Sequence, residues 1–260
     1  MENQAVLYSV ENEIATITLN RPASLNSMNE DLVNELASAL QMAEDANSVR
    51  VIVLTGNGRA FCAGGDLAHL ATLKDAVMAK TFITKVGKLV EKMMSLPKPI
   101  IAMVNGVAAG AGFNLALACD ILYCAKSARF AQSFVKVGLV PDCGGMYLLP
   151  RIVGLHKAKE LMFTADMIDS ATAEKLGLIN KVIEDDALKR ETYQFAETLK
   201  NSAPIAIQFM KSTLNNFDTL TLQNLLKHEA ALQTLCMQTT DYQEGLHAFK
   251  EKRPPKFTGK

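Results

Sequence analysis

The sequence predicts an α/β fold with a mainly parallel sheet, followed by a helical region. Short apolar runs suited to buried strands, at residues 51–54 and 100–104, alternate with helical patterns in the first part of the chain. Alternation of this kind implies crossover connections between parallel strands. After Gly154 the pattern becomes almost entirely helical. We therefore expect one α/β core with a helical appendage.

The N-terminal segments fit this class in order. The β-rich runs 6–10 and 14–19 are separated by three polar residues and predict a hairpin. Leucines four residues apart predict a helix that follows it: Leu32, Leu36 and Leu40. The glycine-containing stretch 55–66 predicts a loop, and a mostly helical segment runs from there to about Met94.

The C-terminal part predicts helices with one short apolar run near 180–183. The helical segments are 155–164, 170–176, 187–201, 204–216 and 221–238. The tail, residues 249–260, is basic and interrupted by prolines, which favours an extended conformation. We divide the chain into a core (residues 1–200) and a C-terminal helical oligomerisation region (residues 201–260).

Composition excludes several classes of protein. The 260 residues carry 27 Lys and Arg against 27 Asp and Glu, and this balance argues against a nucleic-acid partner. The five cysteines are odd in number and form no CxxC pair, so we expect reduced thiols and no metal site. Neither a signal peptide pattern nor an apolar run of membrane-spanning length is evident, which predicts a cytoplasmic protein without a membrane partner.

Two small-residue loops are candidates for binding a carbonyl oxygen. Residues 63–66 (AGGD) follow the run 51–54, and residues 110–112 (GAG) follow the run 100–104. Adjacent parallel strands bring their C-terminal loops to one edge of a sheet, so the N–H groups of Gly65 and Ala111 are expected to converge. The alternative is a pair of tight turns in which glycine supplies positive φ.

Asp142 is the candidate acid. It lies in a second glycine-containing turn, PDCGG, beside a predicted helix start. A carboxylate near an oxyanion site can move a proton. The alternative is a helix N-cap, which would lower the pKa of the carboxyl and weaken it as a base.

Three motifs together resemble the crotonase (enoyl-CoA hydratase/isomerase) superfamily: FCAGGDL at 61–67, NGVAAGAGFNLALACD at 105–120 and FVKVGLVPDCGG at 134–145. The resemblance covers essentially the whole chain. It implies a repeated ββα spiral core, a C-terminal helical trimerisation region, and a homotrimer or dimer-of-trimers hexamer. It also implies an acyl-CoA thioester whose carbonyl lies between the N–H groups of Gly65 and Ala111. Because CoA is part of the substrate, no separate cofactor is implied.

The chain departs from the hydratases of this family at two positions. Where they carry two glutamates, this chain has Asn114 and Phe134, neither of which exchanges a proton near neutral pH. The PDCGG turn and the ending DYQEGLHAFKEKRPPKFTGK instead resemble the 1,2-epoxyphenylacetyl-CoA isomerase group. That group uses an acid at this motif position, and the role transfers to Asp142.

The resemblance predicts a mechanism with one carboxylate. Gly65 and Ala111 stabilise a thioester enolate, while Asp142 removes a proton from one carbon and returns it to another. An apolar wall containing Phe134 is expected to exclude water and raise the pKa of Asp142. Asn114 is expected to bind substrate or a water, or else to be a tolerated polar residue of a helix.

Other residues are expected to contact the substrate: Ala63, Asp66, Leu67 and Gly110 beside the donors, and Lys250 and Phe257 in the tail. Asp66 is also expected to shape its loop. Lysines of the tail are expected to reach CoA phosphates, with a solvated tail as the alternative. The wall that contacts the acyl group is expected to come from residues 68–94, and His69 either faces the cleft or packs.

Several functions stay open at this point. The first is an enoyl-CoA isomerase that shifts a double bond or rearranges an epoxide, as in phenylacetate catabolism. The second is an enoyl-CoA hydratase in fatty-acid or aromatic-acid degradation, with Asp142 as its sole acid and base. The third uses Asp142 as a nucleophile in an acyl-CoA hydrolase or dehalogenase. The last is a CoA-ester-binding subunit without activity.

Overall fold

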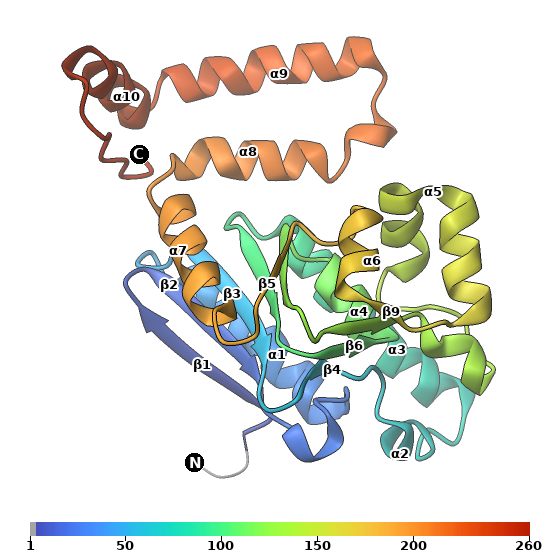
Figure 1. The fold of residues 1–260 in the computed structure, drawn as a ribbon. Helices are drawn as coiled ribbons and strands as arrows, with labels where there is room; N and C mark the ends of the chain where they lie inside the picture. The colour runs from blue at the N-terminus through green and yellow to red at the C-terminus, as the bar shows by residue number, and fades with distance from the viewer. Residues whose placement is uncertain (1–3) are drawn as a thin grey trace.

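The computed structural model describes residues 4–260, which form two β-sheets with helices around them and a helical extension (Figure 1). The larger sheet has the strand order β1-β2-β3-β5-β7-β10. The first two strands form an antiparallel hairpin, and the other neighbours are parallel, which confirms both predictions. Its strands are β1 Val6–Glu11, β2 Ile14–Leu19, β3 Val51–Gly56, β5 Ile100–Val104, β7 Ile121–Ala125 and β10 Lys181–Ile183.

The smaller sheet has the order β4-β6-β8-β9. Its strands are β4 Ala60–Cys62, β6 Val107–Ala109, β8 Arg129–Ala131 and β9 Ile168–Asp169, and only β9 runs antiparallel to its neighbour. The prediction of a loop over 55–66 was therefore wrong, because this stretch contains β4. Strand β6, between the run 100–104 and the loop at 110–112, was not predicted either. Three residues are too few to show the period-2 alternation by which a strand is predicted.

The two sheets explain the repeated ββα architecture. A strand of the larger sheet is followed by a strand of the smaller sheet and then by one or two helices, in the series β3-β4-α2-α3, β5-β6-α4 and β7-β8-α5. The helices of the core are α1 Glu30–Asp45, α2 Leu67–Leu70, α3 Ala76–Ser95, α4 Ala111–Leu117, α5 Gly145–Thr164, α6 Ser170–Lys175 and α7 Leu188–Lys200. Helix α7 packs on strands β2, β3, β5 and β7, and α1 packs on the hairpin and on α3.

Helix α1 shows how the predicted pattern becomes packing. Asn29 begins the helix as N-cap, and its side chain accepts a hydrogen bond from the N–H of Leu32 at 3.0 Å. Leu32, Leu36 and Leu40 are fully buried on one face, as their spacing predicted. Helix α1 therefore closes one side of the core.

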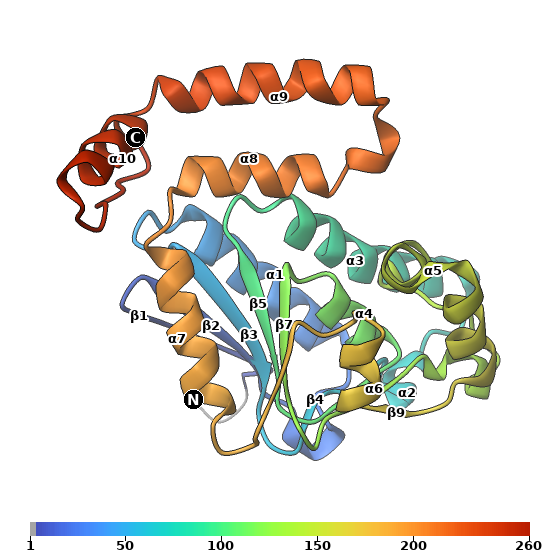
Figure 2. The same cartoon turned by 45° about the horizontal axis from the view of Figure 1, so that its top comes forward.

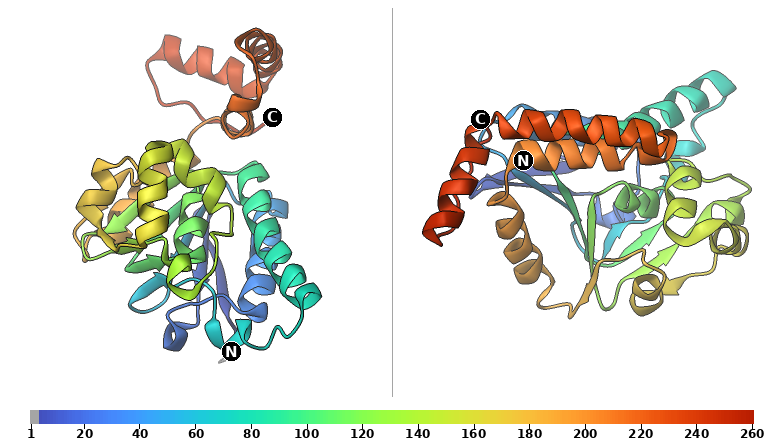
Figure 3. Two further views of the ribbon diagram at one scale, coloured as in Figure 1. Left: turned by 90° about the vertical axis from the view of Figure 1, so that its right-hand side faces the viewer. Right: turned by 90° about the horizontal axis from the view of Figure 1, so that it is seen from above.

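The C-terminal arm, residues 201–260, extends from the core (Figures 2 and 3). It holds α8 Pro204–Leu214, α9 Leu222–Met237 and α10 Thr240–Glu251, with α8 and α9 side by side. The helix α10 was not predicted, and the tail proposed to be extended from residue 249 is helical as far as Glu251. Thr239 caps α10 through its hydroxyl, and this cap helps to start the helix.

Residues 252–260 have no helix or strand and fold back along α10. The Asp241 carboxylate accepts hydrogen bonds from the N–H groups of Thr258, at 2.6 Å, and Gly259, at 2.8 Å. Arg50 of the core donates to the carbonyl of Phe257 at 2.8 Å. The end of the chain is therefore held between the arm and the core. None of the helices described in residues 4–260 is long and apolar enough to cross a membrane.

Candidate active site

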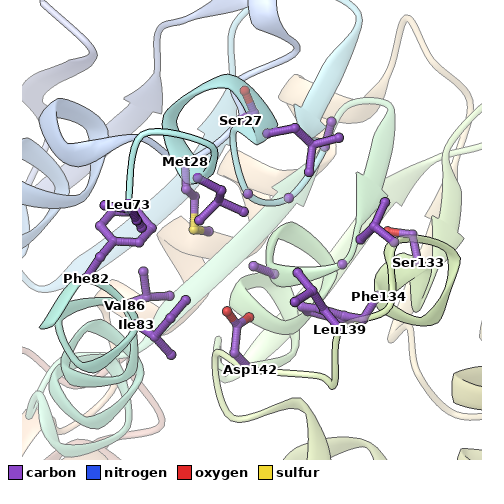
Figure 4. A pocket seen from close by; sticks show the side chains of 18 of the residues that line it. Ser27, Met28, Leu73, Phe82, Ile83, Val86, Ser133, Phe134, Leu139 and Asp142 are labelled. Carbon is purple, nitrogen blue, oxygen red and sulfur yellow. The ribbon is translucent and has the colours of Figure 1, made fainter. Parts of the chain in front are cut away.

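A mostly apolar cavity of about 590 Å³ lies where three strands of the smaller sheet end (Figure 4). Residues 63–65 follow β4, Gly110 and Ala111 follow β6, and Ser133 and Phe134 follow β8, and all of them line the cavity. The predicted convergence of the two loops is present. It arises from the smaller sheet, whose strands β4 and β6 are parallel neighbours.

Gly65 and Ala111 present backbone N–H groups at this cavity. Met28 pairs with the first loop from one side, donating to the carbonyl of Gly64 at 2.7 Å and accepting from the N–H of Asp66 at 3.0 Å. Because successive N–H groups point to opposite sides of an extended chain, the N–H of Gly65 points away from Met28. Ala111 is the first residue of α4, so its N–H has no acceptor within the helix. Among residues 4–260, neither N–H has a hydrogen-bond acceptor.

Gly64 allows the two loops to pack this closely. Its φ is +103°, and a Cβ there would lie 2.9 Å from the carbonyl oxygen of Ala109 and 3.6 Å from the nitrogen of Ala111. Any other residue would push the loops apart or strain the backbone. The spacing of the two N–H groups therefore depends on this glycine.

Asp142 faces the same cavity from the turn before α5. Figure 4 shows its carboxylate between Ile83 and Val86 of α3 on one side and Leu139 on the other. Its Oδ1 is buried without a hydrogen-bond partner among the described residues. Burial raises the pKa of Asp142 from 3.8 to about 6, and its own backbone N–H opposes this only in part. A carboxyl with this pKa can accept and release a proton near neutral pH.

Asp142 does not cap helix α5, so the alternative interpretation was wrong. The N-cap of this helix is Gly144, and no side chain accepts a hydrogen bond there. The carboxylate therefore accepts no hydrogen bond from the first N–H groups of α5, which would lower its pKa further.

Apolar side chains form the rest of the wall. Phe134, at 8% exposure, lies at the position that the sequence analysis assigned to the wall. The segment 68–94 also supplies wall residues, as predicted: Leu70, Leu73, Ala79, Phe82, Ile83 and Val86. Ala63, Leu67 and Gly110 line the cavity too.

Asn114 and Asp66 do not line the cavity, in contrast to their prediction as substrate-binding residues. Asn114 is fully buried, and both ends of its amide bond to protein groups. Asp66 caps α2 by accepting from the N–H groups of Ala68 and His69, and it pairs with Arg21 at 2.9 Å. Partial burial works against the Asp66 charge, but these partners outweigh it and lower the pKa of that carboxyl. Asp66 therefore shapes its loop, as was also expected.

Lys250 and Phe257 lie on the C-terminal arm and are not among the residues that line this cavity. Phe257 packs beside Gly245 of α10. A contact with substrate from these residues would need a second chain, which stays a prediction. The ring of His69 packs edge-on against Phe82 with centroids 4.6 Å apart, which agrees with the packing alternative.

Sequence reasoning missed several residues of the site. Ser27, Met28, Lys136 and Leu139 line the cavity, and Arg21 ties its loops together by donating to the carbonyl of Ser27 at 2.5 Å and pairing with Asp66. The pairing of Met28 with Gly65 is a tertiary contact, so no local pattern indicates these residues. No group of three or more His, Cys, Asp or Glu in the described chain is arranged to hold a metal ion.

The spiral of ββα units and a cavity that combines two free N–H groups with one unpartnered carboxylate define an α/β protein with an enzyme-like site for a carbonyl compound. The family model for enoyl-CoA hydratase/isomerase matches residues 9–260. The chain belongs to this family, and its fold is the crotonase fold, which confirms the resemblance.

Individual relatives are similar to this chain over nearly its whole length. The chain is 40% identical to the 1,2-epoxyphenylacetyl-CoA isomerase of Escherichia coli K12 over 258 residues, which cover 98% of each protein. It is 34% identical over 264 residues to a trans-2-decenoyl-[acyl-carrier-protein] isomerase of Streptococcus mutans, with full coverage of both. A crystal structure of an enoyl-CoA hydratase from Bacillus anthracis has a TM-score of 0.95 at 33% identity and covers 99% of this chain and 100% of that one. Similar proteins therefore include both isomerases and a hydratase.

Proposed function

We propose that the protein is an enoyl-CoA isomerase that shifts a double bond with Asp142 as its only acid and base. One observation carries the proposal. Among the described residues, Asp142 is the only carboxylate that lines the cavity holding the free N–H groups of Gly65 and Ala111. A 1,3-proton shift needs one group that takes a proton and gives it back.

The reaction balances with this one carboxylate. The ionised Asp142 removes a proton from the carbon between the thioester carbonyl and the double bond of a 3-enoyl-CoA. The electron pair moves into the carbonyl oxygen, and the N–H groups of Gly65 and Ala111 stabilise the enolate that forms. Electrons then return from the oxygen, the double bond moves next to the carbonyl, and Asp142 delivers the proton to the far carbon. No separate cofactor enters these steps.

The composition of the cavity favours isomerisation over hydration. Hydration needs a water held and activated beside the double bond, for which the family's hydratases use two glutamates. Phe134 occupies one of those positions, and the Asn114 amide at the other is directed away from the cavity into the protein. A mostly apolar wall around Asp142 also keeps the proton from exchanging with solvent during the shift. A rearranged epoxide of a CoA thioester is a second substrate class that fits this site, supported by the name of the Escherichia coli relative.

The test compares 3-enoyl-CoA with 2-enoyl-CoA as substrates for the protein and for Asp142→Asn. We expect migration of the double bond with the first substrate, slow or no addition of water to the second, and loss of migration in the variant. A saturated acyl-CoA measures binding separately and should bind both proteins equally. Rapid hydration, a covalent ester on Asp142, or binding without any turnover would each favour one of the alternative functions instead.

Several finer predictions accompany the proposal. A homotrimer or hexamer, a cytoplasmic location and a role in fatty-acid or phenylacetate catabolism remain predictions. Sedimentation velocity measures the first directly. If Lys250 and Phe257 reach the substrate of a neighbouring chain, substitutions there will weaken CoA-ester binding only in the assembled protein.

A further inference from the structure

A chain of two buried amides connects the Asp142 turn to the rest of the site. The Asn114 Nδ2 donates to the carbonyl oxygen of Asp142 at 2.8 Å, and the Gln132 Nε2 donates to the Asn114 Oδ1 at 2.7 Å. Both side chains are buried, at 0% and 1% exposure, and neither lines the cavity. We infer that Asn114 and Gln132 are positioning residues that hold the Asp142 carboxylate in place for proton transfer. This inference rests on the proposed function of Asp142.

The Asp142 side chain itself provides no anchor. Its Oδ1 has no hydrogen-bond partner in the described chain, so the direction of the carboxylate depends on the placement of its own backbone. That backbone leads directly into an unusual conformation, because Cys143 has a φ of +49°. Left-handed backbone at a residue other than glycine persists only where surrounding contacts hold it. Burial of Cys143 and the bond from Asn114 to the preceding carbonyl are such contacts.

Asn114 couples the acid to an oxyanion donor. It lies three residues after Ala111 on helix α4, so the two residues share one side of that helix. A single short helix therefore presents the Ala111 N–H and also binds the turn that carries Asp142. The distance between the enolate oxygen and the proton acceptor is then set by one rigid element.

The hydrogen bond from Asn114 to the Asp142 carbonyl fits only because residue 145 is a glycine. A Cβ at Gly145 would overlap the amide group of Asn114. The Gly145 N–H also donates to the Asp142 carbonyl at 2.9 Å, so this oxygen receives two hydrogen bonds. Gly145 and Asn114 thus hold the Asp142 carbonyl together, and the glycine also leaves the space that the Asn114 amide occupies.

Gln132 is kept at a cost to stability. Its Oε1 is buried without a partner in the described chain, and such a group lowers stability. Gln132 follows β8, whose Ala131 carbonyl accepts the N–H of Gly110 at 2.9 Å beside the oxyanion loop. The amide chain therefore joins helix α4 and the segment after β8 to the Asp142 turn, which is what a positioning role requires.

The experiment is a double-mutant cycle between Asn114→Ala and Asp142→Asn, read as kcat for double-bond migration and as Kd for a saturated acyl-CoA. In the otherwise normal protein we expect Asn114→Ala to lower kcat roughly 10- to 100-fold while Kd changes less than about twofold. In the Asp142→Asn background the same change should have almost no effect, because the group that Asn114 positions is gone.

The outcomes separate this inference from the proposed function. If Asp142→Asn retains turnover, the proposed function fails. If Asp142→Asn is inactive but Asn114→Ala keeps its kcat within about twofold, or lowers the residual rate equally in both backgrounds, the positioning inference is wrong. Leu40→Ala in α1 is the control, since Leu40 is fully buried yet not part of the cavity lining. It should lower Tm without lowering kcat.

Gln132→Met tests the same inference if Asn114→Ala does not fold. Methionine fills a similar volume and removes the unpartnered Gln132 Oε1, but it also leaves the Asn114 Oδ1 without its donor. Because one unpartnered buried acceptor replaces another, Tm should change little. We expect kcat to fall roughly 3- to 10-fold, again only when Asp142 is present. An unchanged kcat in this folded variant would overturn the role of the amide chain.

Discussion

Strand β3 and helix α9 show the two ways in which this chain is stabilised. All six residues of β3 are buried, whereas α9 has no buried residue in the single chain. Large apolar side chains of α9 remain open to solvent, including Leu222 at 72% and Leu226 at 54% exposure. The core is therefore held by burial of apolar surface, while the C-terminal arm relies on helix caps and a few anchors. An apolar surface of this kind is typical of an interface, which supports the predicted assembly.

The anchors of the arm are polar. Lys211 of α8 donates to the Asp120 carboxylate at 2.7 Å and to the carbonyl of Lys98 at 3.1 Å. Asn215 donates to the carbonyl of Met94 at 2.8 Å. Burial raises the pKa of Asp120, and the nearby Lys211 charge offsets this only in part. The core therefore contains two carboxylates with a raised pKa, Asp120 at the contact with the arm and Asp142 at the cavity, but only Asp120 has a cationic partner.

The largest effect on activity is expected from removal of the unpaired carboxylate of Asp142. Asp142→Asn should lower kcat by about 10²- to 10⁴-fold, as is typical when a general acid–base group is lost. Stability should not fall. The pKa of this carboxyl is higher in the folded chain, about 6, than its ordinary 3.8, so ionisation lowers stability as pH rises through that window. Steady-state kinetics and urea unfolding at pH 5 and 8 test both statements, and a loss of stability in the variant would contradict the second.

The next largest effect comes from breaking the ion pair between Lys211 of the arm and Asp120 of the core. Lys211→Ala should lower the free energy of unfolding by about 3 kcal/mol, because it leaves Asp120 buried without a cation. Urea denaturation measures this. Lys157→Ala is the matched control, since its pair with Glu160 is exposed and should change the free energy by less than about 0.5 kcal/mol. Equal effects of the two substitutions would show that the anchor of the arm is no stronger than a surface pair.

A smaller effect follows from the pKa of Asp142. The base must be ionised, so kcat/KM should rise with pH through about 6 and become constant above about 7. At pH 5 it should be about one tenth of the constant value, since roughly a tenth of the carboxyl is then ionised. A profile that stays flat down to pH 4.5 would mean that another group accepts the proton.

The smallest expected change in stability concerns the exposed face of the arm. Leu226→Gln should alter the free energy of unfolding of a single chain by less than about 0.5 kcal/mol, because the side chain contacts mainly solvent there. If α9 lies at an interface between copies, the same change should weaken assembly, which sedimentation velocity measures. Leu7, exposed on strand β1 at 38%, provides a control as Leu7→Gln. Identical sedimentation of the unchanged protein, Leu226→Gln and Leu7→Gln would argue against an interface on α9.

Long, periodic or motif-rich segments could be predicted from the sequence. The hairpin β1–β2, the face of α1 with Leu32 and Leu36, and the convergence of the loops around Gly65 and Ala111 are as expected. The short strands β4 and β6 could not be predicted, because three residues carry no period and their pairing partners are distant in the chain. Helix α10 was missed because its stability depends on a cap and on contacts with the returning tail.

The sequence by itself determined the chemical groups that are available: one acid at Asp142, small residues at the two donors, and an amide and an aromatic ring, not carboxylates, at positions 114 and 134. The tertiary structure alone decided how those groups behave. It buries Asp142 without a partner, which raises its pKa, and it points the Asn114 amide at the Asp142 carbonyl across 28 residues of chain. Burial and hydrogen bonding are contacts between distant segments, so no local pattern contains them.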